Sequence, residues 1–226
     1  MLNEARVWPD AKLLSVEEDF DLVLPTRYNA VSEDMNWSDN IKIDVSYRFT
    51  NAIRRNQFKL GKYGSGRMTC RMLYAILVKY FNRGEYFIET YFERLFQDRF
   101  KKDINALVNK IKRKYKEIQA EAMFEMLYTR SGNQDRRSRG YKKLSEFEEW
   151  KDEELESHMK TMSRAIRKDI QNCLATGKIP LWMGFPAQAT MERRMKLGLD
   201  SIHAFYASGD LINHLVVYYK VEMSGV

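Results

Sequence analysis

The glycine-rich segment FKLGKYGSGR, residues 58–67, is the sequence's nearest approach to a phosphate-binding loop. Glycines at 61, 64 and 66 permit positive φ angles, and such loops can present backbone N–H groups to phosphate oxygens. A nucleotide-binding loop needs the order Gly-x-x-x-x-Gly-Lys-Ser/Thr, whereas Lys62 here precedes the last two glycines. We therefore interpret the segment as a glycine turn between a strand and a helix.

Residues that bind metals or transfer protons are present, but they do not cluster. The three histidines, His158, His203 and His214, are far apart and have no Cys or carboxylate at ligand spacing. The densest acidic run is EFEEWKDEELE at 146–156, near the start of a predicted helix. Exposed carboxylates at this end of a helix are stabilised by the helix dipole, so we interpret the run as a solvated helix face and not as a pair of catalytic acids. We expect no metal, no cofactor and no catalytic activity.

Basic side chains are concentrated in the middle of the chain, although the net charge of the whole chain is only +7. Residues 1–50 carry a net charge of −5, residues 51–143 carry +14, and residues 144–226 carry −2. This division indicates a polarised surface, which suits either a polyanion or a neighbouring subunit of opposite charge.

Two basic groups are the candidate nucleic-acid contacts. One lies on the polar face of a predicted helix at about 100–128, and the other lies in the polar segment 129–143, which we expect to be a mobile loop. An arginine-rich loop can follow any phosphate backbone, which favours binding without sequence preference. The helix face has an ordinary alternative, because an amphipathic helix needs a polar side. The candidates are Lys112, Arg113, Arg136, Arg137, Arg139, Lys142 and Lys143.

Composition indicates a folded chain with a real core. Hydrophobic residues make up 44% of the 226 residues, and no uncharged apolar run is long enough to cross a membrane. Cys70 and Cys173 give neither metal spacing nor a disulfide framework, which favours a reducing compartment. The first residues, MLNEARVWPD, lack the pattern of a signal peptide.

Periodicity predicts an α+β fold, in which several long helices pack on a small, mostly antiparallel sheet. Apolar and polar residues alternate over 41–49, as in a half-buried strand. Helical spacing runs from residue 68 to about 128 with a break at Gly84, returns at about 145–175, and ends in a short basic helix at 190–196.

These patterns divide the chain into four expected parts. Residues 1–40 form an N-terminal arm or irregular cap, and residues 41–128 form a strand plus a helical region. The mobile basic loop at 129–143 is the expected boundary, and residues 144–226 contain the long helix, a loop and a C-terminal strand.

The last third of the chain has an ordered series of features. A helix is followed by a Pro-containing loop, a Thr with basic residues, a small-residue turn and an alternating strand. The positions are Pro186, Thr190, Arg193, Arg194, Ser208, Gly209, Asp210 and Leu211, then Leu215, Val217, Tyr219 and Val221. This order resembles the signature region of the neck and tail-completion (head-tail connector) proteins of HK97-like tailed bacteriophages.

The resemblance implies a structural virion protein, assembled in the host cytoplasm. Copies would form a homo-oligomeric ring at the phage neck, between the portal and the tail and around the DNA channel. The protein's partners would be other neck, portal and tail proteins, its work would be completion of head-tail joining, and no membrane would be involved. The resemblance covers only the last third of the chain and does not extend to residues 1–140.

The final strand raises a question about its neighbours. Val216 and Tyr218 lie on the face opposite Val217 and Tyr219, so the strand is partly apolar on both faces. Such a strand is either central in a sheet or covered by another subunit. Residues 41–49 are candidates for a neighbouring strand, which would bring the two ends of the chain into one sheet.

The alternative function is non-specific nucleic-acid binding in phage replication or packaging. The basic middle region supports it, and nothing in the sequence resembles a sequence-reading module with a fixed recognition helix. A large closed ring in solution would favour the neck protein, and a monomer or dimer with tight DNA binding would favour the alternative.

Overall fold

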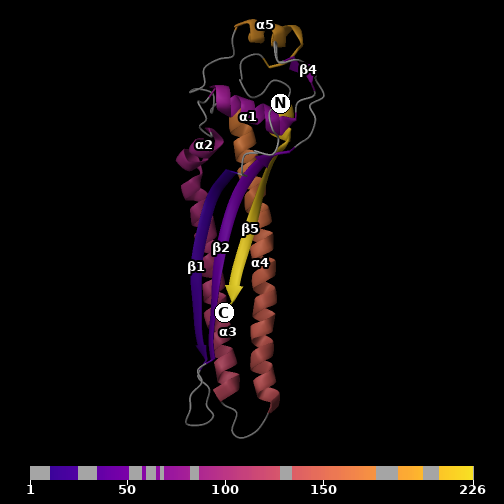
Figure 1. The fold of residues 1–226 in the computed structure, drawn as a ribbon. Helices are drawn as coiled ribbons and strands as arrows, with labels where there is room; N and C mark the ends of the chain where they lie inside the picture. The colour runs from indigo at the N-terminus through magenta and orange to yellow at the C-terminus, as the bar shows by residue number, and fades with distance from the viewer. Residues whose placement is uncertain are drawn as a thin grey trace. The chain divides into compact units, whose positions relative to one another are not determined.

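The structure, a computed structural model, describes residues 11–24, 35–50, 58–59, 65–66, 69–81, 87–127, 134–176, 188–200 and 209–225. It has the expected α+β fold, with helices and a small three-stranded antiparallel sheet (Figure 1). The strands are β1 (Ala11–Leu24), β2 (Met35–Phe49), β3 (Phe58–Lys59), β4 (Ser65–Gly66) and β5 (Leu215–Gly225). The helices are α1 (Cys70–Phe81), α2 (Phe87–Leu95), α3 (Gln97–Leu127), α4 (Gln134–Ala175), α5 (Gln188–Lys196) and α6 (Asp210–Asn213).

The chain forms two compact units. Unit 1 contains the described residues of Met1–Leu14, Val45–Asp98 and Ser163–Tyr219. Unit 2 contains those of Ser15–Asp44, Arg99–Met162 and Lys220–Val226. This division differs from the four parts expected from the sequence, because each unit collects segments that are distant along the chain.

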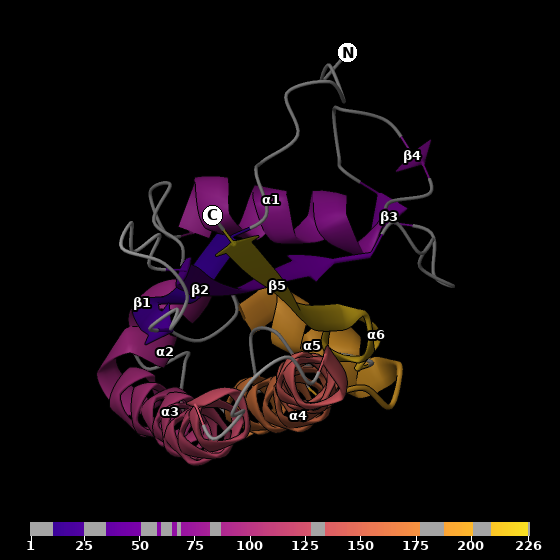
Figure 2. The ribbon, with the colours of Figure 1, turned by 90° about the horizontal axis from the view of Figure 1, so that it is seen from below.

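In unit 2 the strands bury one face against helices. Ile41 and Ile43 of β2 are 1% and 0% exposed, and Val16 of β1 is also buried. The intervening Lys42 and Asp44 are half-buried on the opposite face, as the alternation predicted. Figure 2 shows α3 and α4 on one side of the strands, which explains why only one strand face is apolar.

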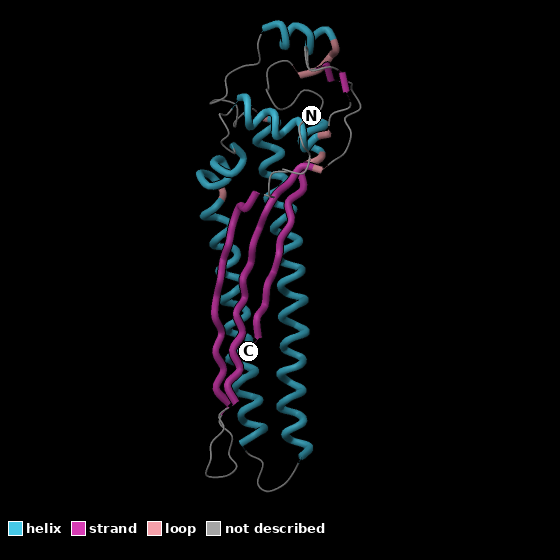
Figure 3. Tube along the Cα trace, in the orientation of Figure 1, coloured by secondary structure: helices cyan, strands magenta, loops and turns pink. Residues whose placement is uncertain are grey.

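Helices α3 and α4 lie side by side in unit 2 (Figure 3). The ring centroids of Tyr115 and Phe147 are 5.3 Å apart, and Lys110 forms a 2.7 Å ion pair with Glu154. Farther along α3, Glu121 pairs with Lys143, which lies earlier in α4. Later residues of α3 therefore meet earlier residues of α4, so the two helices are antiparallel.

The expected loop at 129–143 is wrong for residues 134–143, which form the first turns of α4. Lys142 pairs with Glu146 one turn later at 3.8 Å, and Lys143 pairs with Glu121 of α3 at 2.6 Å. Arginine and lysine are good helix formers, and charge pairs can stabilise a helical segment that has no apolar stripe. Residues 129–133 lie outside the described ranges.

The structure confirms three of the expected helical features and corrects the expected N-terminal cap. The helix expected at 100–128 is α3, the long helix ends at Ala175 as expected, and the short basic helix is α5. Residues 11–24 form strand β1 rather than an irregular cap. In the glycine segment, β3 and β4 pair antiparallel, and residues 60–64 between them lie outside the described ranges.

Unit 1 is held by an aromatic group between β2 and α1 and by contacts of α2 with α4. The hydroxyls of Tyr47 and Tyr74 lie 2.7 Å apart, and the Phe49 ring is 4.4 Å from that of Tyr74. In α2, the buried Tyr91 hydrogen-bonds with the buried Cys173 of α4. These contacts fix α2 with Glu89 half-buried on it.

The half-buried Glu89 should make the stability of the folded protein depend on pH. Burial and the nearby Glu93 raise the pKa of Glu89 from 4.5 to about 7. The folded protein then holds this proton more tightly than the unfolded chain does. The stability that the group contributes is therefore full below about pH 4.5 and is lost as the pH rises to about 7. We expect Glu89→Gln to melt at a higher temperature than the parent at pH 8, with the difference narrowing toward pH 5.

The control is Asp152→Asn, which removes an exposed carboxylate of α4 that lies outside the candidate contacts. Thermal melts of the three proteins at both pH values provide the measurement. An equal gain for Glu89→Gln at pH 5 and pH 8 would contradict the assignment of the titration to Glu89.

Candidate assembly site: the turn before β5 and the edge strand

The turn that leads into β5 begins at Gly209. This residue is buried and has φ 75° and ψ −6°, in the left-handed region. A side chain in this conformation costs roughly 1–2 kcal/mol, so the position favours glycine. Of the neighbouring Ser208, which the sequence also singled out, nothing is described.

Apolar side chains anchor the short helix that follows. Leu211 is 4% exposed, and Ile212 and Leu215 are also buried. The sequence had assigned Leu211 the role of anchoring the turn, and its burial agrees with that role. The four-residue helix α6 is too short to be stable alone, so these contacts with unit 1 hold it in place.

Two side chains of α4 hold the end of α6. The Arg167 Nη2 donates to the carbonyl oxygen of Asn213 at 3.1 Å, and the Gln171 Nε2 donates to that of Ile212 at 2.9 Å. The last carbonyls of a helix have no partner within the helix, and these bonds supply one. Arg167 and Gln171 are four residues apart, so both lie on the same face of α4.

A third connection joins the turn to the end of β2. The backbone N–H of Thr50 donates to the carbonyl oxygen of His214 at 3.0 Å. The Thr50 hydroxyl also lies 3.3 Å from the His214 Nδ1. The turn is therefore tied to both the long helix and the neighbouring strand.

Strand β5 lies next to β2, in the order β1-β2-β5. The expectation that residues 41–49 supply a neighbouring strand is confirmed. The alternative that β5 is central in its sheet is wrong, because within the described residues it is an edge strand. Leu215 and Val217 are buried, Tyr219 is half-buried, and Met223 is 45% exposed. The apolar face of β5 thus becomes more exposed toward its end.

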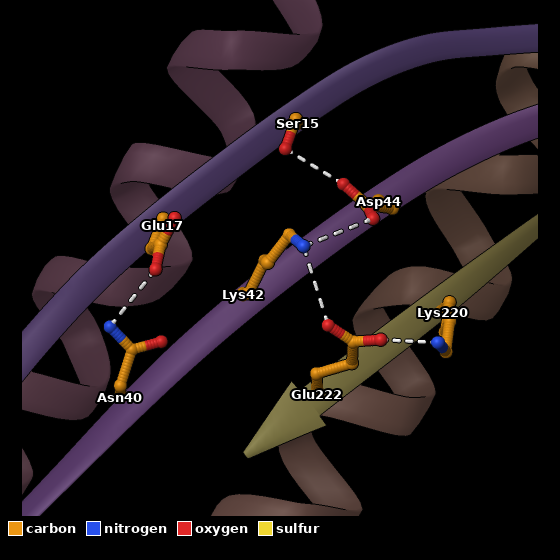
Figure 4. Close-up of polar contacts among 7 residues, drawn as sticks. All are labelled: Ser15, Glu17, Asn40, Lys42, Asp44, Lys220 and Glu222. Carbon is orange, nitrogen blue, oxygen red and sulfur yellow. Dashed lines mark hydrogen bonds and ion pairs between the residues drawn. The ribbon is translucent and has the colours of Figure 1, made fainter. Parts of the chain in front are cut away.

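In unit 2 the sheet face opposite α3 and α4 is polar and largely self-neutralised (Figure 4). Ser15 donates to Asp44 at 2.7 Å, and Asn40 donates to Glu17 at 3.3 Å. Glu222 of β5 accepts from Lys220 and, at 3.4 Å, from Lys42. Hydrogen bonds and charge from these two lysines lower the pKa of Glu222. On this face Lys42 and Lys220 thus bind carboxylates of β2 and β5.

Of the predicted nucleic-acid contacts whose side chains are described, three form ion pairs. Lys112 pairs with Glu18 of β1 at 2.7 Å, and Lys143 and Lys142 make the ion pairs described above. The hydrogen bond that Lys143 donates to Glu121 raises the pKa of Lys143. Arg113 and Arg139 are exposed. Arg136 and Arg137 belong to α4, and their side chains are not described.

The structure separates the other features of the family resemblance. Gly209, Leu211, Val217 and Tyr219 fall on the turn and the strand that it starts. Thr190, Arg193 and Arg194 lie on α5, none of whose residues is buried, and Pro186 is outside the described ranges.

The sequence reading missed three residues that fix the turn: Arg167, Gln171 and Thr50. For Arg167 and Gln171 the sequence contains a weak indication of a shared role, because polar residues four apart on a predicted helix lie on one face. For Thr50 the sequence contains no such indication.

Comparisons of the chain with protein-family models, with curated proteins and with solved structures found no match. Within the described ranges, no group of three or more His, Cys, Asp or Glu side chains is placed to hold a metal ion. None of the helices in that part of the chain combines the length and apolar character that crossing a membrane requires.

Leu211→Asp tests the turn. The change buries a charge in an apolar site, and we expect it to lower the free energy of unfolding by roughly 3–5 kcal/mol. Asn213→Asp is the matched control, because it adds the same charge to an exposed position of α6 and should cost no more than about 0.5 kcal/mol. Denaturant unfolding of both variants gives the comparison. Equal stability of the two variants would show that Leu211 does not anchor the turn.

Proposed function

We propose that this chain is a structural protein of the tailed-phage neck. Copies of it form a ring between portal and tail around the DNA channel, and they complete head-tail joining by binding and geometry. The observation that carries the proposal is the turn before β5. Residues of the family-like signature, Gly209 and Leu211, build a buried turn that joins the long helix α4 to an edge strand.

The polar groups around the turn support a structural role. Arg167 and Gln171 donate to backbone carbonyls, and His214 contacts the hydroxyl of Thr50. In other proteins, side chains of these types can be catalytic or ligand-binding groups. In this chain they fix the position of β5. The turn therefore connects α4 to β5 in a fixed position.

The edge strand supports assembly. An edge presents unpaired backbone N–H and C=O groups, which can pair with a strand of another chain. Met223, at 45% exposed, and the half-buried Tyr219 and Val221 add apolar surface beside this edge. A neighbouring subunit would cover both, which agrees with the second alternative left open by the sequence.

The runner-up, non-specific nucleic-acid binding in replication or packaging, has weaker support. Of its candidate contacts, Lys112 and Lys143 are half-buried and bonded to Glu18 and Glu121, so displacing these carboxylates would oppose phosphate binding. Any binding through the exposed Arg113 and Arg139 would fall steeply with salt, through counterion release.

The mass of the purified protein in solution tests the proposal. We expect a closed assembly many times the mass of one chain, visible as rings in electron micrographs. Leu211→Asp should abolish it, whereas Asn213→Asp should leave it intact. A parent protein that stays monomeric or dimeric at high concentration, and binds DNA tightly, would favour the runner-up instead.

A further inference from the structure

The outward face of α3 carries a ridge of exposed cations. At about 3.6 residues per turn, Lys102, Arg113 and Lys116 lie opposite the buried stripe that contains Ile104 and Ile111. Asn105 and Asn109 are exposed between them, and the ridge is about 21 Å long. We call Lys102, Arg113 and Lys116 the basic ridge.

Apart from Asp98, which lies one turn before Lys102, the carboxylates of α3 lie on a different part of the helix. Glu117 and Glu121 fall on the flank where Lys110 reaches Glu154 of α4, and Glu121 pairs with Lys143. On the other flank, Lys112 pairs with Glu18 of β1. Ion pairs inside unit 2 thus engage both flanks, while the basic ridge between them faces away from the sheet.

The outward face of α4 carries the opposite charge. Glu146, Glu149, Glu153 and Glu156 are exposed and lie opposite the buried Leu155 and Met159. This acidic ridge is about 15 Å long. Its ends are partly neutralised, because Glu146 pairs with Lys142 and Glu156 pairs with Lys160. Glu149 and Glu153 in the middle form no ion pair with another described residue.

We infer that the basic ridge of α3 docks on the acidic ridge of α4 in a second copy of this chain. Both ridges belong to unit 2 and lie on the same helical layer (Figure 2), so they cannot meet within one copy. Each copy therefore offers both halves of a complementary contact. The inference rests on the self-assembly of the proposed function and names the surfaces that carry it.

Charge complementarity indicates that the partner of each ridge is a second copy of this chain. The contact would place the cations of one copy against Glu149 and Glu153 of the next, as Lys110 meets Glu154 within unit 2. Using α3 toward one neighbour and α4 toward the other gives a ring if rotation closes it. If two copies were instead related by a two-fold axis, both contacts would form between the same two copies, and assembly would end at a dimer.

Charge reversal tests the contact in the full-length protein. One variant carries Lys102→Glu, Arg113→Glu and Lys116→Glu, and another carries Glu149→Lys, Glu153→Lys and Glu156→Lys. We expect each to weaken self-association by at least about tenfold at an ionic strength of about 0.05 M, because like charges then face each other. Sedimentation and mass photometry provide the measurement. A charge-matched control reverses Lys168, Arg193 and Lys196, which are exposed but lie off both ridges.

Two rescues make the test specific. A chain that carries all six reversals again presents opposite charges, and it should assemble within a few-fold of the parent. A mixture of the two triple variants should form mixed assemblies that alternate the two chains, although neither assembles alone. Thermal melts of each variant show whether a lost assembly reflects unfolding.

The outcomes separate this inference from the proposed function. A parent ring that both triple variants still form overturns the ridge contact and leaves the neck ring standing. Pairs or open chains that are lost on reversal and restored in the six-fold variant keep the contact and overturn the ring. A monomeric parent overturns both. Loss of duplex-DNA binding with intact assembly in the α3 variant assigns the basic ridge to DNA and overturns the contact.

Discussion

The need to cover one face of β2 is the constraint on which the rest of the structure depends. Ile41 and Ile43 of β2 are 1% and 0% exposed, and Lys42 between them is charged. A strand patterned in this way is stable only when an apolar layer lies on one side. In unit 2, α3 and α4 provide that layer, so each helix must bury a stripe and expose a polar face. The outward charges of both helices follow from this requirement.

The same constraint makes the turn before β5 important. β5 lies beside β2, and its inward residues Leu215 and Val217 are buried. The starting position of β5 is set by Gly209, by the anchor Leu211, and by α4 side chains that bind the carbonyls of α6. The segment on which the proposed function rests thus connects the long helix α4 to an edge strand through buried apolar side chains and side-chain hydrogen bonds.

Charge has two separate uses in unit 2. Pairs such as Lys112–Glu18 and Lys110–Glu154 lie on helix flanks and connect neighbouring elements. Exposed pairs of this kind contribute little each, typically about 1 kcal/mol or less, but they select one arrangement of strands and helices. The basic ridge of α3 and the middle of the acidic ridge of α4, Glu149 and Glu153, form no ion pair with another described residue. The basic middle of the sequence therefore divides into cations used for folding and cations available to a partner.

The sequence by itself determined the features that depend on local period. Alternation over 41–49 and helical spacing over 100–128 identify β2 and α3, because burying a strand face or a helix stripe requires that spacing. The sequence failed at residues 134–143, a helical segment with Tyr141 as its one large apolar residue, where Lys143 forms an ion pair with Glu121 of another helix. Tertiary structure alone decided that β5 lies at an edge of its sheet rather than at the centre, and that Arg167, Gln171 and Thr50 hold its turn. Thr50 and His214 are 164 positions apart, and no local pattern records a contact between residues so distant in the chain.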